Sequence, residues 1–306
     1  MKWLCNLVSV LLVPVVSLLS GCPVKAGTHI TITQNWCPIM ITQPGEYDLA
    51  TDLACTNDND GIEILASDVT LHLDGHTIKG NTSCGPRFGV SVSPPFNAPM
   101  LSQVRVLGPG TISNFEFGFF AKDSKDSFVK FTTVTADCPF FTLTTGFAIY
   151  GPASHWKLQG NVVREPGPTS TGIVLVRIDD SHLVANDVND SIGLVDSSNN
   201  VVANNIADDS GGGGIFLEGG SNNNEIHANT TNNENVGLGI YVGSTGNNVT
   251  GNYSFANSYS DILDLNPCGT DKWRGNHFGT ANQPCIQSGK DDDRKDEDSE
   301  KDDDRG

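Results

Sequence analysis

The sequence predicts an all-β protein, a single-stranded right-handed parallel β-helix of about eight rungs with a cap at each end. Three observations favour this fold. A glycine followed by a short apolar strand recurs every 21–29 residues, a small residue followed by asparagine recurs within the same units, and helical periodicity is absent. A repeat of this length cannot bury its apolar face alone, so the units must stack on one another.

The first repeat consists of eight glycines, each followed by a strand of period two. In Gly61-Ile-Glu-Ile, the first and third residues after the glycine are expected to face inward and the second and fourth outward. Asp196 would take an inward third position, where a carboxylate needs a partner or a raised pKa. The eight glycines are Gly61, Gly89, Gly118, Gly146, Gly172, Gly193, Gly214 and Gly239.

The second repeat places an asparagine after a small residue, with an apolar residue three positions earlier. Asparagine suits a bend because it tolerates left-handed backbone angles and its amide bonds locally. Three short strands per turn are therefore expected. An antiparallel sandwich is the alternative, but it predicts turn signals at a shorter interval, every 8–12 residues. The asparagines are Asn161, Asn186, Asn204, Asn229, Asn252 and Asn276.

Residues 1–26 are interpreted as an export signal. The apolar run between Leu4 and Leu19 is too short for a membrane span. The stretch that ends at Cys22 resembles the lipobox of bacterial lipoproteins, in which the cysteine is acylated, and ordinary cleavage after Ala26 is the alternative. We expect an outer-membrane or cell-surface lipoprotein, or a secreted protein, with membrane contact only through a lipid on Cys22.

The rest of the chain divides by composition. Residues 27–57 are expected to form the N-terminal cap, 58–264 the β-helix and 265–289 a disulfide-closed C-terminal cap. Residues 290–306 contain ten acids, five bases and no apolar side chain, so they predict a disordered charged tail.

Six cysteines remain after the signal, an even number that favours disulfides in an oxidising compartment. Their spacing predicts the local pairs Cys37–Cys55 and Cys268–Cys285. The pair Cys84–Cys138 follows by elimination.

The formal net charge of −18, with only 18 Lys and Arg, disfavours nucleic acid as a partner because phosphates would be repelled. No cluster of basic residues is visible along the chain. We expect a monomer.

The stretch from Gly61 to Gly80 resembles a full rung of the right-handed parallel β-helix repeat proteins, a group that includes pectate-lyase-like enzymes, alginate lyases and epimerases, and NosD-like proteins. The resemblance covers about residues 35–285. It implies the fold, and it implies that sugar chains bind along the face of the first strand, while the fold alone leaves the activity open.

The outward positions of the first strands are rich in apolar and aromatic residues, as interaction surfaces are. Aromatic rings can pack on the C–H face of a sugar. The alternative is that a loop near 93–103 or 164–171 covers this strip. The expected polysaccharide-binding residues are Phe120, Phe216, Glu218 and Tyr241.

A catalytic group is suggested by Lys122, Tyr150 and Arg177, which fall near one another on consecutive rungs. A polysaccharide lyase needs a cation to neutralise a uronate carboxylate and groups to move protons, and these side chains have that chemistry. The stretch from Tyr150 to His155 also resembles a motif of mannuronan epimerases, although Ala153 replaces its acid. The alternative is that Lys122, Tyr150 and Arg177 are ordinary surface residues without a catalytic role.

Asp179 and Asp180 begin the densest carboxylate group of the body, with Asp187 and Asp190 nearby. Oxygen-rich groups suit Ca²⁺, which we consider as a cofactor. The alternative is that these are turn residues. The sequence thus predicts an exported protein that binds a polysaccharide and, if it is an enzyme, processes it as a lyase or C5-epimerase would. A non-catalytic envelope scaffold is the second interpretation.

Overall fold

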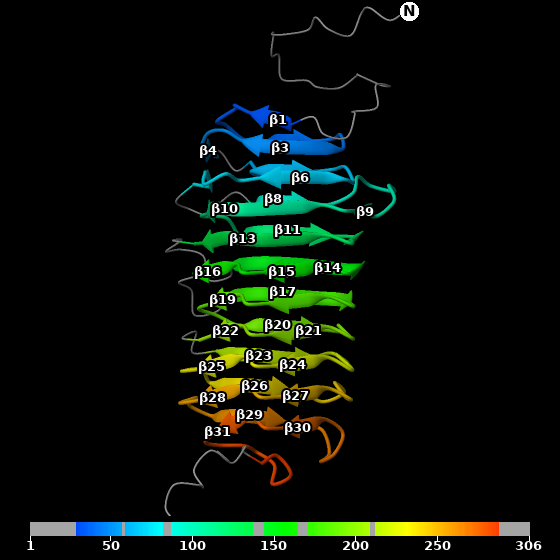
Figure 1. Cartoon of the computed structure of the whole chain (residues 1–306), viewed down its shortest axis with the longest axis vertical. Helices are drawn as coiled ribbons and strands as arrows, with labels where there is room; N and C mark the ends of the chain where they lie inside the picture. Colours follow the sequence, from blue (N-terminus) through cyan, green and yellow to red (C-terminus); the bar gives the residue numbers. More distant parts are fainter. Residues whose placement is uncertain are drawn as a thin grey trace, which may run out of the picture.

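The structure, a computed structural model, describes residues 29–56, 59–81, 87–136, 144–164, 170–208 and 212–287. Within these ranges all regular secondary structure is β-strand, and the strands pair in parallel from rung to rung (Figure 1). The described residues contain no helix that could span a membrane. The all-β parallel β-helix is confirmed.

The strand that opens each rung belongs to one sheet, called here the first-strand sheet. Its ten successive strands exceed the eight glycine units by two, because residues 39–41 and 260–264 each add a strand. The strands are β2 (Ile39–Ile41), β5 (Ile62–Ile64), β8 (Phe88–Val92), β11 (Phe117–Lys122), β14 (Thr145–Ser154), β17 (Thr171–Asp179), β20 (Ile192–Val195), β23 (Gly213–Glu218), β26 (Val236–Ile240) and β29 (Ser260–Asp264), with β9 (Leu101–Ser102) and β12 (Ser124–Lys125) at its margin.

The later strands of each rung form a second, continuous sheet. Its first face, called here the second-strand face, is made by β1 (His29–Ile32), β3 (Gly45–Leu49), β6 (Val69–His72), β10 (Arg105–Ser113), β13 (Phe128–Thr135), β15 (Lys157–Gln159), β18 (His182–Val184), β21 (Val201–Ala203), β24 (Glu225–His227), β27 (Asn248–Thr250) and β30 (Lys272–Arg274). The third strands are β4 (Leu53–Ala54), β7 (Thr77–Lys79), β16 (Val162–Arg164), β19 (Asp187–Val188), β22 (Ile206–Ala207), β25 (Thr230–Asn232), β28 (Tyr253–Phe255) and β31 (His277–Phe278), while β10 and β13 are long enough to pair on both faces.

The segments expected to be caps supply strands of the terminal rungs. β3 pairs with β6 at one end, and β30 pairs with β27 at the other. The disulfides Cys37–Cys55 and Cys268–Cys285 are confirmed, and each closes a loop at its end of the stack. Cys84 and Cys138, the expected signal with Cys22, and the expected charged tail lie outside the described residues.

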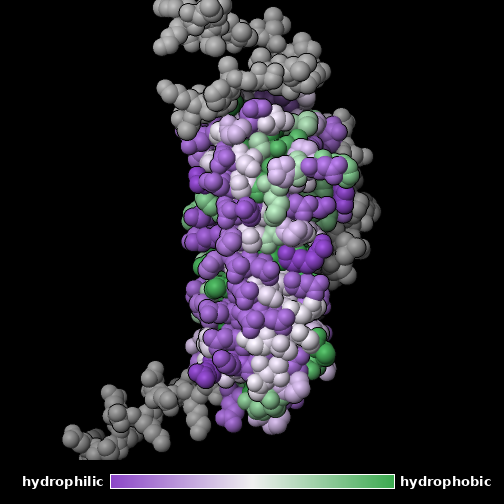
Figure 2. Space-filling model, turned by 90° about the vertical axis from the view of Figure 1, so that its right-hand side faces the viewer, coloured by the Kyte–Doolittle hydropathy of each residue, from purple (hydrophilic) through white to green (hydrophobic). Residues whose placement is uncertain are grey.

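The core fills the interior of the prism. Inward residues of the first strands, such as Ile62 and Ile64, are fully buried, and the middle rungs are filled by the rings of Phe119, Phe147 and Trp156. On the long side shown in Figure 2, hydrophilic residues predominate, with a narrow apolar strip in the upper half and smaller apolar groups near the lower end. Burial inside the prism therefore provides the main apolar contact that stabilises the stack.

The expected alignment is wrong in two rungs. Gly193 pairs with Val174 and Phe216, and Gly239 pairs with Phe216, so both glycines occupy the outward second position. The inward residues of the first of these rungs are Ile192 and Leu194. Asp196 is consequently an exposed turn residue with φ 49°, not an inward carboxylate.

The asparagines form a buried ladder, and its member in the middle rung is Asn205 rather than Asn204. Each side-chain Nδ2 donates to Oδ1 of the asparagine in the next rung at 2.9–3.0 Å. The left-handed residue is the one before each ladder asparagine, so the asparagine satisfies backbone groups at the bend instead of making the bend. The ladder is Asn161, Asn186, Asn205, Asn229, Asn252 and Asn276, preceded by left-handed Gly160, Ala185, Asn204, Ala228, Gly251 and Gly275.

A second ladder at the previous corner has no counterpart in the sequence analysis. The backbone N–H of each member donates to the side-chain oxygen of the next one, through Ser181, Asn200, Asn224, Asn247 and Asp271. In the rungs between Ser181 and Asp271, two hydrogen-bonded corners per rung hold the faces of the prism together.

Candidate functional site

The outer face of the first-strand sheet carries two rows of side chains that run along the stack. With the corrected pairing, the second-position row reads Glu63, Ser91, Phe120, Ala148, Val174, Gly193, Phe216 and Gly239. Tyr241 follows Ile240, which pairs with Leu217, so Tyr241 lies beside Glu218 in the next rung. The correction therefore brings predicted binding residues together.

A pocket of about 350 Å³ opens on this face between β23 and β26. Phe216 lies over Gly193, because a Cβ atom built on that glycine would be 2.3 Å from the ring Cζ. Tyr241 likewise approaches Gly239, with ring Cε2 3.3 Å from where a Cβ would be. The two outward glycines thus leave room for two rings. The lining residues are Gly212, Gly213, Ile215, Phe216, Glu218, Asn235, Val236 and Tyr241.

The polar groups of the pocket complement its rings. Burial, and next the charge of Glu218, raise the pKa of the Tyr241 phenol, so the hydroxyl stays protonated and able to donate at neutral pH. Glu218 offers carboxylate oxygens as acceptors. A few polar groups beside ring faces are typical of a site for a sugar or another small polar molecule.

Phe120, the fourth predicted binding residue, belongs to a separate aromatic group. Its ring stacks on Phe88 at 4.5 Å between centroids and lies 5.7 Å from both Phe117 and Tyr150. The Arg87 guanidinium lies 5.0 Å over the ring of Phe88. Four rung steps separate β11 from β23, which corresponds to about 19 Å at the usual strand spacing. The predicted binding residues therefore form two groups on one face.

The structure places the catalytic candidates on neighbouring rungs. Lys122 and Tyr150 are direct register partners. Arg177 follows Val176, the register partner of Tyr150, and is exposed with φ 57° opposite a bulge of β14. Lys122 Nζ lies 3.8 Å from Asp123 Oδ2. A cation and a phenol are thus adjacent, with a second cation one position further along.

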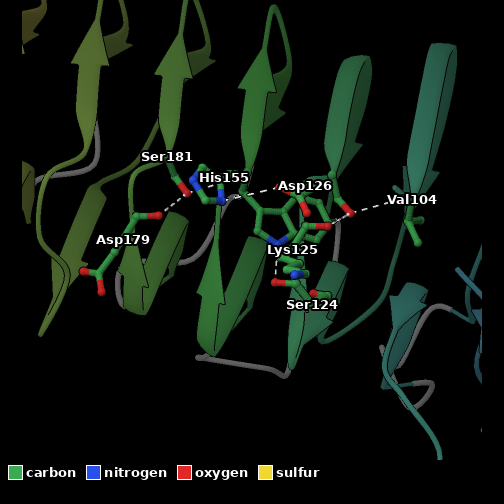
Figure 3. A network of polar contacts seen from close by, with 9 residues as sticks. Val104, Ser124, Lys125, Asp126, His155, Asp179 and Ser181 are labelled. Carbon is green, nitrogen blue, oxygen red and sulfur yellow. Dashed lines mark hydrogen bonds and ion pairs between the residues drawn. The ribbon is translucent and has the colours of Figure 1, made fainter. Parts of the chain in front are cut away.

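The corner after these residues carries polar contacts that the sequence analysis did not identify (Figure 3). His155 and Asp126 face one another from adjacent rungs, with Nδ1 3.4 Å from Oδ1. The indole of Trp156 donates to the Ser124 carbonyl at 3.2 Å. Both His155 and Asp126 have positive φ, so the corner geometry turns their side chains outward and side by side. The mannuronan-epimerase-like stretch therefore ends at a histidine that has an acid neighbour from another rung.

The carboxylates considered for calcium do not gather. The described residues contain no group of three or more His, Cys, Asp or Glu that could hold a metal ion. Asp179 accepts the backbone N–H of Ser198 at 2.9 Å, and Asp180 is exposed with φ 54°. Asp187 pairs with Arg164, and Asp190 accepts the N–H of Ser191. These contacts favour the alternative interpretation of Asp179 and Asp180 as turn residues.

Comparison with known proteins agrees with the fold. The family described as "Right handed beta helix region" matches residues 110–254. No curated protein matches the chain by sequence.

Several solved structures are similar. The mannuronan C-5 epimerase A-module of Azotobacter vinelandii has a TM-score of 0.57 and 12% identity, over 85% of this chain and 84% of that one. A polygalacturonase from Erwinia carotovora has a TM-score of 0.54 and 11% identity, over 78% and 76%. The periplasmic alginate epimerase AlgG has a TM-score of 0.53 and 12% identity, over 79% and 76%. Likeness at these identities shows the fold alone. On its strand pairing, family match and structural neighbours, the chain has the right-handed parallel β-helix fold.

Proposed function

We propose that this protein is exported and binds a polysaccharide along the first-strand sheet, with the pocket at Phe216, Glu218 and Tyr241 as its main sugar subsite. The observation that carries the proposal is the pair of rings seated over two outward glycines beside a carboxylate and a phenol. A sugar ring can pack its C–H face on the rings while its hydroxyls bond to Glu218 and Tyr241.

Two further observations support this proposal. The similar structures include an alginate epimerase, a mannuronan epimerase and a polygalacturonase, whose names refer to polysaccharides. Two disulfides suit an oxidising compartment outside the cytoplasm. Export, and the anchoring of the chain through Cys22, belong to the proposal.

Processing of the bound chain is a second candidate function, favoured by the adjacency of Lys122 and Tyr150 with Arg177 next to them. In a β-elimination, Lys122 or Arg177 would neutralise a uronate carboxylate. The Tyr150 oxygen would take the proton from the carbon beside that carboxylate as the carbon–carbon double bond forms, and the same group would give a proton to the glycosidic oxygen as its C–O bond breaks. A lyase leaves an unsaturated sugar, so the increase in ultraviolet absorbance during incubation with alginate or polygalacturonate tests this function directly.

The binding proposal is tested with Phe216→Ala combined with Tyr241→Ala. We expect the double variant to bind polysaccharide more weakly by about 1–3 kcal/mol, the scale of two partly buried rings. Affinity electrophoresis in gels that contain alginate, polygalacturonate or a neutral glucan measures the change.

The matched control is Tyr253→Ala with Phe255→Ala, which removes two exposed rings from β28 on a different face. His227→Ala on the second-strand face is a further control that we expect to be silent. If the double variant binds the neutral glucan and the acidic polymers as tightly as the wild type does, or if no polysaccharide binds to the wild type, the scaffold interpretation replaces this one.

A further inference from the structure

Basic residues that are far apart in the sequence converge on the second-strand face. Arg105, Phe128 and Lys157 are register partners in three consecutive rungs. Lys130 projects outward two positions after Phe128, so two cations lie over the Phe128 ring and a third, Lys157, is its register partner in the next rung. Stacking of rungs more than 20 residues long produces this cluster, which is why it is invisible along the chain. We call Arg105, Phe128, Lys130 and Lys157 the cationic patch.

Cation–π contacts organise the patch. The Arg105 guanidinium carbon lies 5.6 Å from the centroid of the Phe128 ring, and Lys130 Nζ lies 4.6 Å from it. Contacts of this kind hold the cations close to the sheet. The sites of positive charge are therefore more ordered than those of isolated surface lysines.

Acidic neighbours do not neutralise these charges. None of the ion pairs in the described part of the chain includes Arg105, Lys130 or Lys157. From β10 to β21 the two outward columns of this face contain no acid; they hold Arg105 with Leu107, Phe128 with Lys130, Lys157 with Gln159, His182 with Val184, and Val201 with Ala203. A protein with a net charge of −18 thus presents one unneutralised basic surface.

An exposed ring borders the patch. Phe131 follows Lys130 with φ 55° and is 59% exposed. Its ring lies over Gly160 in the next rung, where a Cβ atom would come within 2.7 Å of it. The patch therefore combines cations with an accessible ring edge and face.

We infer that the cationic patch is a binding surface for an acidic polysaccharide, one that carries carboxylates or sulfates, and that it is separate from the first-strand pocket. Its cations recur rung by rung, about 4.8 Å apart along the stack. An extended sugar chain advances by a similar length per unit, so successive acidic groups can meet successive cations. Phe131 can pack on a sugar C–H face.

A membrane surface fits the patch less well. Membrane-binding surfaces place several apolar side chains where they can enter the lipid, with basic residues around them. Here Phe128 is half-buried beneath two cations, and among the described residues Phe131 is the one strongly exposed ring beside them.

The test replaces the three cations with Arg105→Gln, Lys130→Gln and Lys157→Gln in the full chain. The control removes the same charge elsewhere on the second sheet, with Lys79→Gln, Lys272→Gln and Arg274→Gln, all exposed. Binding to polygalacturonate, alginate and heparin is measured by calorimetry at low salt, with dextran as a neutral probe, and circular dichroism verifies that both variants are folded.

We expect the patch variant to bind the acidic polymers about tenfold more weakly, and the control variant to change by about twofold or less. Binding should also weaken as salt is added. The fold-loss caused by the three patch substitutions should be the same in the wild type and in the Phe216→Ala, Tyr241→Ala variant, because independent surfaces contribute additively, and this separates the two surfaces. Equal losses in both charge variants, no binding of any acidic polymer by the wild type, or a patch variant that loses only binding to phosphatidylserine vesicles would overturn the inference.

Discussion

The asparagine ladder can be tested by comparing two adjacent residues, because Asn205 is a buried member of the ladder whereas Asn204 is exposed and outside it. Asn205 Oδ1 accepts the backbone N–H and the Nδ2 of Asn186, both at 2.9 Å, and its own Nδ2 donates to the Leu183 carbonyl and to Asn229 Oδ1. Replacing Asn205 by Ala leaves two buried donors of Asn186 without their acceptor. At about 1–3 kcal/mol for each unsatisfied group, we expect the free energy of unfolding to fall by about 2–6 kcal/mol.

Asn204→Ala is the matched control. Asn204 is exposed in the left-handed region with φ 55°, and Ala185 and Ala228 hold the same position in neighbouring rungs with φ 55° and 54°. Alanine is therefore accommodated there, and we expect a cost of about 1 kcal/mol or less. Urea unfolding followed by far-ultraviolet circular dichroism measures both variants. If Asn204→Ala costs as much as Asn205→Ala, the assignment of the ladder is wrong.

Two other predictions concern ionisation and export. Burial raises the pKa of Asp190 from 3.8 to about 7, so between these values the folded protein holds a proton that the unfolded chain releases. Its free energy of unfolding should therefore fall as the pH rises from about 4 to 7, by up to about 4 kcal/mol, and Asp190→Asn should remove this fall. The midpoint of urea unfolding, measured between pH 4 and 7 for the wild type and the variant, tests this prediction. If the variant shows the same pH dependence as the wild type, the raised pKa does not belong to Asp190. Cys22→Ser should abolish acylation in a bacterial host and release the protein from membranes, as fractionation and mass spectrometry would show; a wild type that is already soluble and begins at Gly27 would favour simple secretion.

Much of the fold could be predicted because the inward pattern of each rung is local. Ile62 and Ile64 are the first and third residues after Gly61, and both are buried as the pattern predicts. The two cysteines of a pair, such as Cys37 and Cys55, also lie within about one rung of each other in the sequence. The alignment failed at Gly193 because a glycine can have either of two roles. Gly172 is needed where a Cβ would meet Val188 at 2.0 Å, whereas Gly193 is needed where a Cβ would meet the ring of Phe216. The two roles look the same in the sequence.

The candidate site was predictable in its residues but not in their grouping. Phe216, Glu218 and Tyr241 were expected to bind ligand, yet only the true pairing brings Tyr241 beside Glu218. Phe120 lies in a different aromatic group. The cationic patch could not be predicted because Arg105, Phe128 and Lys157 each lie one full rung apart in the sequence. Basic residues at that spacing do not form a visible cluster along the chain, although stacking of the rungs brings them together.

The hydrogen-bonded corners have a polarity. In both ladders the amide of each rung donates toward the C-terminal end and accepts from the N-terminal end, so their dipoles add along the stack as peptide dipoles do in an α-helix. If the stack were divided between two rungs, the N-terminal fragment would expose side-chain donors and the C-terminal fragment would expose side-chain acceptors. The two exposed surfaces would therefore be complementary. Asp271 Oδ1 accepts the N–H and Nδ2 of Asn247 at 2.8 and 3.0 Å, and its carboxyl group has no amide N–H that could continue the ladder. One of the two columns of side-chain amides therefore ends at a carboxyl group.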